Sequence, residues 1–185
     1  MHYAIDTLGG LPAHPAIVHI PVVMVPVAFV LAALAVRPGF RAWALPSAVV
    51  SSLIGLVGAL LAGGTGESLQ HSVDRTQLVR NHIQAADRVN VFLVPFTVLI
   101  VVALVVHWAR QGTIPFASRL TRVTDAIVPR VTGWSARTVT ALIAVTALIG
   151  GFASWAVYDA GHSGAKSVWH DVKIVPENHG GDNDD

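Results

Sequence analysis

The chain has 185 residues, of which 53% are hydrophobic and only 12% are charged, and it contains no cysteine. Soluble domains carry about 25% charged residues, so this composition is typical of an integral membrane protein. The absence of cysteine excludes disulfides, thiolate metal sites, iron–sulfur clusters and the C-x-x-C-H attachment of c-type haem. The net charge of +1 indicates no nucleic-acid partner, because phosphate binding requires a concentrated basic surface.

Four apolar runs, at residues 16–36, 42–64, 89–108 and 138–158, reach the length of about 20 residues that a membrane-spanning helix needs. They predict an all-α fold, a four-helix transmembrane bundle with antiparallel, up-down topology. Residues 1–158 form the membrane domain in this interpretation, and residues 159–185 form a polar extracytoplasmic tail. The region before the first run has no Lys or Arg, so we expect a retained span rather than a signal peptide.

Basic residues predict the orientation of the spans. Seven lie in or beside the first and third connections, and five lie on the opposite side: Arg37, Arg41, Arg110, Arg119, Arg122, Arg130 and Arg137 against Arg75, Arg80, Arg88, Lys166 and Lys173. The positive-inside rule therefore predicts that both termini and the 65–88 connection lie outside the cytoplasm. We expect the long 109–136 connection to contain a short amphipathic helix on the inner surface.

In this orientation all histidines except His107 belong to the outer side. Together with nearby carboxylates they form a candidate metal set: His14, His19, Glu67, His71, His82, Asp87 and His162. Imidazole and carboxylate ligands suit Zn, Cu, Fe or Ni. Pro15 favours the first helical turn, so His14 is expected at the helix cap or just before it. We expect residues 161–165 to turn the chain back over this end as a lid.

Small residues at positions 51, 55, 58, 59 and 62 share one face of the second span. Such a face lets a neighbouring helix or a flat ligand approach closely. Close helix packing and a cofactor groove are therefore both compatible with the pattern.

Three stretches of the chain resemble a bacterial membrane family catalogued as domain of unknown function 2231. They are His14-Pro15-Ala16-Ile17-Val18-His19-Ile20-Pro21, Ala62-Gly63 with an acidic residue after it, and Tyr158-Asp159-Ala160-Gly161-His162-Ser163-Gly164-Ala165. The resemblance covers residues 11–170 and implies a four-helix protein of the bacterial cytoplasmic membrane with no established reaction. The layout is also similar to that of diheme b-type cytochromes, although His107 has no partner for a second, inner haem.

Three functions remain open at this point. The first is a redox module with one b-type haem, for which His19 and His82, on alternate and parallel spans, are the expected axial ligands. The second is a divalent metal site, for metal sensing, delivery or hydrolysis, built from the candidate metal set. The third is an accessory or structural subunit of a membrane complex without a cofactor.

The sequence contains no H-E-x-x-H and no Ser or Cys nucleophile motif, so we do not expect an enzyme acting on its own. The expected partners are the lipid bilayer, a membrane redox protein, and further copies of this chain or other subunits.

Overall fold

The computed structural model describes residues 7–8, 10–70, 73–74, 76–115 and 121–171. This part of the chain is helical apart from a short hairpin of β1 (Thr7–Leu8) and β2 (Leu11–Pro12). The helices are α1 (His14–Ile17), α2 (His19–Ala35), the 3₁₀ turn η1 (Pro38–Phe40), α3 (Arg41–Gln70), α4 (Gln77–Gln111), α5 (Thr121–Val131) and α6 (Ala136–Trp169).

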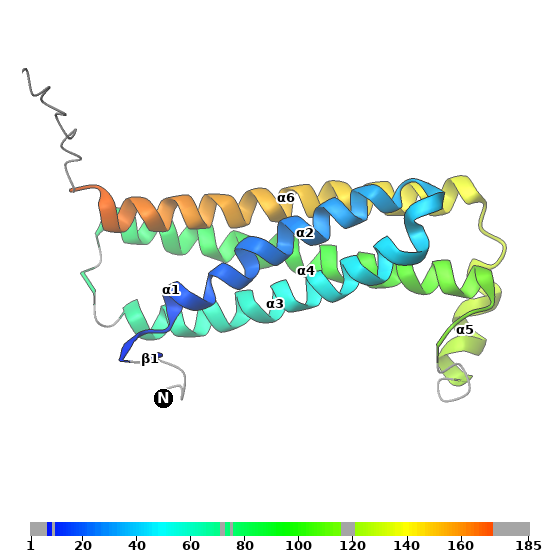
Figure 1. Ribbon diagram of the computed structural model, residues 1–185, viewed down its shortest axis with the longest axis horizontal. Helices are drawn as coiled ribbons and strands as arrows, with labels where there is room; N and C mark the ends of the chain where they lie inside the picture. Colours follow the sequence, from blue (N-terminus) through cyan, green and yellow to red (C-terminus); the bar gives the residue numbers. More distant parts are fainter. Residues whose placement is uncertain (1–6, 9, 71–72, 75, 116–120, 172–185) are drawn as a thin grey trace, which may run out of the picture.

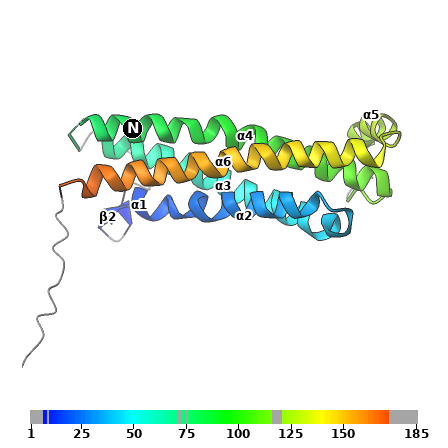
Figure 2. The same cartoon turned by 90° about the horizontal axis from the view of Figure 1, so that it is seen from above.

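Helices α2, α3, α4 and α6 lie side by side in one elongated bundle, as Figures 1 and 2 show from two directions. Helix α2 packs against α3 and α6, and α4 packs against α3 and α6. The expected all-helical fold is therefore confirmed. Helix α5 lies at one end of the bundle (Figure 1), so the 109–136 connection contains a helix as expected.

The four long helical segments have the length and hydropathy of membrane spans: His14–Ala35, Pro38–Gln70, Gln77–Gln111 and Ala136–Trp169. Their outer faces are apolar. Val91, Leu148 and Phe152, for example, expose 64%, 67% and 57% of their surface. Apolar surface on this scale is covered by lipid or by another protein. The multi-pass membrane class expected from composition therefore agrees with the structure.

Small residues bring α2 and α3 close together. A Cβ added at Gly55 would lie 2.8 Å from Cγ2 of Val25, and one at Gly58 would lie 2.6 Å from Cγ2 of Ile20. Both distances are shorter than carbon atoms tolerate, so α2 itself occupies this face. Of the two interpretations of the small-residue face, close helix packing therefore applies at Gly55 and Gly58.

Three helices extend beyond the expected apolar runs. Helix α4 begins at Gln77, as the absence of Gly and Pro from the residues that follow predicts. Helix α3 continues to Gln70, and α6 continues to Trp169, past the expected domain boundary at residue 158. The lid expected at residues 161–165 is wrong, because these residues are helical. Gly161 and Gly164 permit a turn but do not impose one, and tertiary packing overrides a weak local preference.

The N-terminal entry into the bundle has a break at Val18, between α1 and α2. Pro21 has no backbone N–H, so the carbonyl of Ile17 loses its usual helical partner at this point. The N-cap of α1 is Ala13, and His14 is the first helical residue rather than the cap.

Candidate functional site

His14, at the start of α1, contacts the end of α3. Its Nδ1 lies 2.9 Å from the carbonyl oxygen of Ala62, and its ring is partly buried. A carbonyl oxygen only accepts hydrogen bonds, so Nδ1 carries the proton and donates it. The hydroxyl oxygen of Thr65 lies 3.5 Å from the same nitrogen. The Thr65 hydroxyl hydrogen is shared between the carbonyls of Ala62 and Leu61, which both lie within hydrogen-bond distance.

His82, near the start of α4, makes the equivalent contact with α6. Its Nδ1 lies 3.0 Å from the carbonyl oxygen of Ala160 and 3.3 Å from Oγ of Ser163. The Ser163 hydroxyl donates to the Ala160 carbonyl at 2.9 Å. The His82 imidazole is therefore fixed as the Nδ1–H donor, as in His14.

Both imidazoles rest on the same five-residue motif, Ala-Gly-x-Ser/Thr-Gly. It occurs at residues 62–66 of α3 and again at residues 160–164 of α6. In each copy the alanine carbonyl accepts from the histidine, and the hydroxyl three residues later lies near the same Nδ1. The glycine at the end of each copy provides room for the ring, because a Cβ at Gly66 or Gly164 would lie 3.1 Å or 3.0 Å from the Cε1 of its histidine.

The two imidazole rings are in edge-to-face contact across the bundle. Their ring centres are 6.3 Å apart, and the ring planes are inclined by 75°. Since Nδ1 donates in both rings, the free lone pair of each neutral ring is on Nε2. Metal-binding histidines commonly have this arrangement, in which a backbone carbonyl fixes the tautomer and the orientation of the ring. We refer to His14 and His82 as the histidine pair.

His19, the other ligand expected for haem, makes a different contact. Its Nδ1 donates to the carbonyl of Pro15 in the preceding turn at 2.8 Å, and the residue is exposed. The structure thus brings His14, rather than His19, into ring contact with His82. Five residues correspond to about 140° around a helix with 3.6 residues per turn, so His14 and His19 project to different sides.

The remaining members of the candidate metal set do not gather around the histidine pair. Glu67 and Asp87 are exposed, and His162 is exposed and stacks on Tyr158, with ring centres 5.8 Å apart. His71 lies outside the described residues. Within the described ranges, no group of three His, Asp or Glu side chains is placed to hold an ion. Among the described members of the set, the structure brings His14 and His82 into ring contact.

One nearby carboxylate has a different partner. Asp159 forms an ion pair with Arg88 at 3.2 Å, and both side chains are substantially exposed. An exposed pair of this kind contributes about 0–1 kcal/mol. It connects α4 with α6 next to the histidine pair.

Sequence reasoning missed the role of His14 as the partner of His82. The signal that could have identified it is the repeat itself, Ala62-Gly63-Gly64-Thr65-Gly66 and Ala160-Gly161-His162-Ser163-Gly164. Two equal motifs on different helices predict two equivalent ligand environments.

Comparison of the chain with protein-family models, with curated proteins and with solved structures gives no match. The resemblance to domain of unknown function 2231 therefore stays a prediction.

Proposed function

We propose that this multi-pass membrane protein is a redox module that holds one b-type haem between His14 and His82. The observation that carries the proposal is the contact between the two rings of the histidine pair, whose Nδ1 atoms donate to backbone carbonyls and whose Nε2 lone pairs remain available for a metal. This pair replaces the His19–His82 pair expected from sequence.

The spacing of the rings suits one metal ion between them. An imidazole nitrogen binds a metal at about 2.0–2.1 Å and lies about 1.2 Å from the ring centre, so two rings on opposite sides of an ion have centres about 6.4 Å apart. The histidine pair has a separation of 6.3 Å. The separation of the ring centres is therefore close to that of two imidazoles that ligate one ion.

The number of ligands favours haem over a free divalent ion. A haem iron takes four nitrogens from its macrocycle and needs only the axial ligands from protein, whereas a catalytic zinc ion takes three protein ligands and a structural one takes four. When bound, haem supplies one-electron transfer.

The positive-inside count supports placing the histidine pair and both termini on the outer side of a bacterial cytoplasmic membrane. Electrons would then pass to or from a partner at that side. The chain would be one component of a redox assembly rather than a complete pathway across the bilayer, because it offers one histidine pair within the described residues.

The test is the absorption spectrum of the full-length protein purified in detergent from cells supplied with a haem precursor. We expect a Soret band in the wild type, and its loss in His14→Ala and in His82→Ala. His19→Ala is the matched control, since this histidine lies five residues from His14 and is not in the pair. A band that survives in both pair variants, or disappears in His19→Ala, would contradict the assignment.

A cofactor-free accessory function is the second candidate. Each histidine already connects two helices by a hydrogen bond, His14 from α1 to α3 and His82 from α4 to α6. If the histidines are purely structural, the wild type will show neither a Soret band nor bound metal by elemental analysis, and it will not bind added haemin. Bound metal without a Soret band would instead support the divalent-ion alternative.

A further inference from the structure

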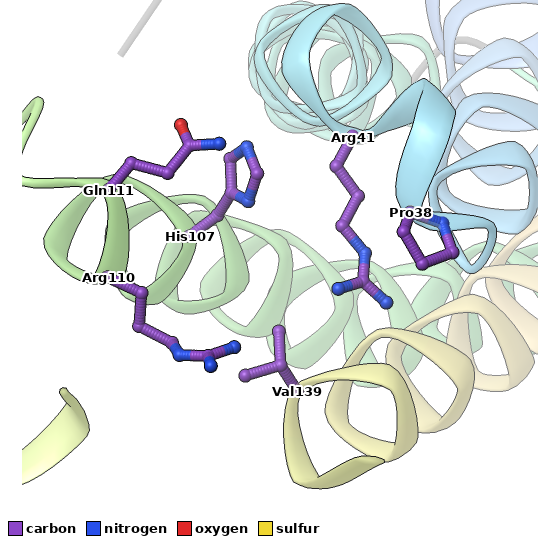
Figure 3. Close-up of a pocket in the computed structure, with 6 residues that line it drawn as sticks. All are labelled: Pro38, Arg41, His107, Arg110, Gln111 and Val139. Carbon is purple, nitrogen blue, oxygen red and sulfur yellow. The ribbon is translucent and has the colours of Figure 1, made fainter. Parts of the chain in front are cut away.

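A second polar site lies at the opposite end of the bundle, at the junction of η1 with α3, α4 and α6. A cavity of about 300 Å³ is lined by Pro38, Arg41, His107, Arg110, Gln111 and Val139. Figure 3 shows the guanidinium groups of Arg41 and Arg110 and the imidazole of His107 around one common space. We refer to this cavity as the arginine pocket.

Arg41 is 94% buried in the pocket, and its guanidinium group is held there by three hydrogen bonds. Its Nε donates to the carbonyl of Ala35 at 3.1 Å, and its Nη2 donates to the carbonyl of Val36 at 3.2 Å and to Oγ1 of Thr140 at 2.7 Å. The first two bonds satisfy carbonyls at the C-terminal end of α2, where a cation is favoured. The third connects Arg41 to α6. No described residue accepts a hydrogen bond from Nη1.

The positive charge in the arginine pocket has no carboxylate against it. Among the described residues, neither Arg41 nor Arg110 has a carboxylate oxygen within ion-pair distance, and no Asp or Glu lines the cavity. The two guanidinium groups are also close enough to repel each other. Two cations held together without a counter-charge create a local potential that attracts an anion.

His107 adds an unused polar atom. Its Nε2 is buried and has no hydrogen-bond partner within the described part of the chain. A buried polar atom without a partner is unfavourable, because it has lost its hydrogen bond to water, so such atoms commonly mark a bound water, ion or ligand. In its protonated-Nε2 tautomer, this nitrogen would donate to an anion in the pocket.

We propose that the arginine pocket binds a phosphate-type anion, with Arg41, Arg110 and His107 as hydrogen-bond donors. A guanidinium group matches the geometry of phosphate oxygens and can donate two bonds to one anion. Pro38 and Val139 supply the apolar wall, and Gln111 supplies a further donor. The arginine pocket does not depend on the histidine pair, because it lies at the opposite end of the bundle and is lined by other residues.

Two sources could supply this anion. One is the headgroup of an acidic phospholipid, since the pocket lies at the end of spanning helices, where headgroups are located. The other is free phosphate or a soluble phosphate ester. The volume is about that of ten water molecules in the liquid, which accommodates a phosphate group from either source.

The experiment uses the full-length protein in detergent micelles and two probes. Native mass spectrometry measures the binding of phosphatidylglycerol and, as the neutral control, phosphatidylcholine with the same acyl chains. Thermal unfolding with and without inorganic phosphate measures the soluble source. Arg110→Gln is the test variant, because Arg110 is exposed and its replacement should not disturb folding.

The matched control is Arg137→Gln, which removes one exposed arginine at the same end of the bundle without changing the pocket lining. We expect Arg110→Gln to weaken anion binding about 10- to 100-fold, as the loss of a charge-assisted hydrogen bond predicts. We expect Arg137→Gln to change it less than about threefold, as for a screened surface charge.

Each outcome identifies the source of the bound anion or overturns the proposal. Selective binding of phosphatidylglycerol that is lost in Arg110→Gln supports a lipid headgroup. Stabilisation by inorganic phosphate that is lost in the same variant, without lipid selectivity, supports a soluble anion. If neither probe binds the wild type, or if both variants weaken binding equally, the arginine pocket is not an anion site.

Discussion

Gly164→Ala should displace His82 from its position, whereas Gly161→Ala should leave the site unchanged. Both glycines lie in the same copy of the repeated motif, three residues apart on α6. A Cβ at Gly164 would lie 3.0 Å from Cε1 of His82, while a Cβ at Gly161 would meet no atom within 4 Å. The pair of variants therefore isolates the contact with the imidazole.

Two opposing effects determine how each substitution changes the stability of the protein. Replacing a helical glycine by alanine gains about 0.8–1.0 kcal/mol in helix propensity, and this gain is common to both variants. The extra methyl group against His82 costs about 1–3 kcal/mol through overpacking, and this cost applies only to Gly164→Ala. We therefore expect Gly161→Ala to be more stable than Gly164→Ala by about 1–3 kcal/mol.

Thermal unfolding of both variants in the same detergent measures this difference. For a chain of this size, 1 kcal/mol corresponds to about 2–4 °C, so the two midpoints should differ by about 2–12 °C. The ¹⁵N resonance of Nδ1 of His82 provides a second measurement, because moving the ring weakens its 3.0 Å bond to Ala160. Equal midpoints and an unshifted resonance would refute the argument that Gly164 provides the space for the ring.

Two further predictions concern the bundle and its orientation. A Cβ at Gly150 would lie 2.7 Å from Phe96, whereas one at Gly151 would meet its nearest atom at 3.5 Å. The free energy of unfolding of Gly150→Ala, measured by denaturant unfolding, should therefore be lower than that of Gly151→Ala by about 1–3 kcal/mol. The chain contains no cysteine, so single cysteines report topology directly. In intact cells, Asp74→Cys should react with a membrane-impermeant maleimide and Thr132→Cys should not, and the reverse pattern would invert the proposed orientation.

The sequence determined the four spans and the class of protein. Hydropathy and length are local properties, and a spanning helix satisfies all its backbone hydrogen bonds within its own segment. The apolar runs could therefore be identified without knowledge of their neighbours. The small-residue face of the second span was compatible with close packing and with a cofactor groove, and the contacts of Gly55 and Gly58 with α2 show close packing.

The ends of the helices were less accessible to sequence reasoning. Residues beyond an apolar run carry no strong local preference, so the continuation of α6 through Gly161 and Gly164 depends on packing against α4. The same continuation presents the carbonyl of Ala160 to His82.

Only the tertiary structure decided which histidines meet. The depth of each histidine along the bundle and its direction around the helix axis determine which rings meet. Both depend on helix ends and on contacts between helices, which periodicity does not encode. His14 and His19 project to different sides of their helical segment, and the packing of α1 on α3 brings His14 to the first copy of the motif. A sequence can thus supply two equivalent niches and nine histidines, but the assignment of His14 and His82 to those niches comes from how four helices pack together.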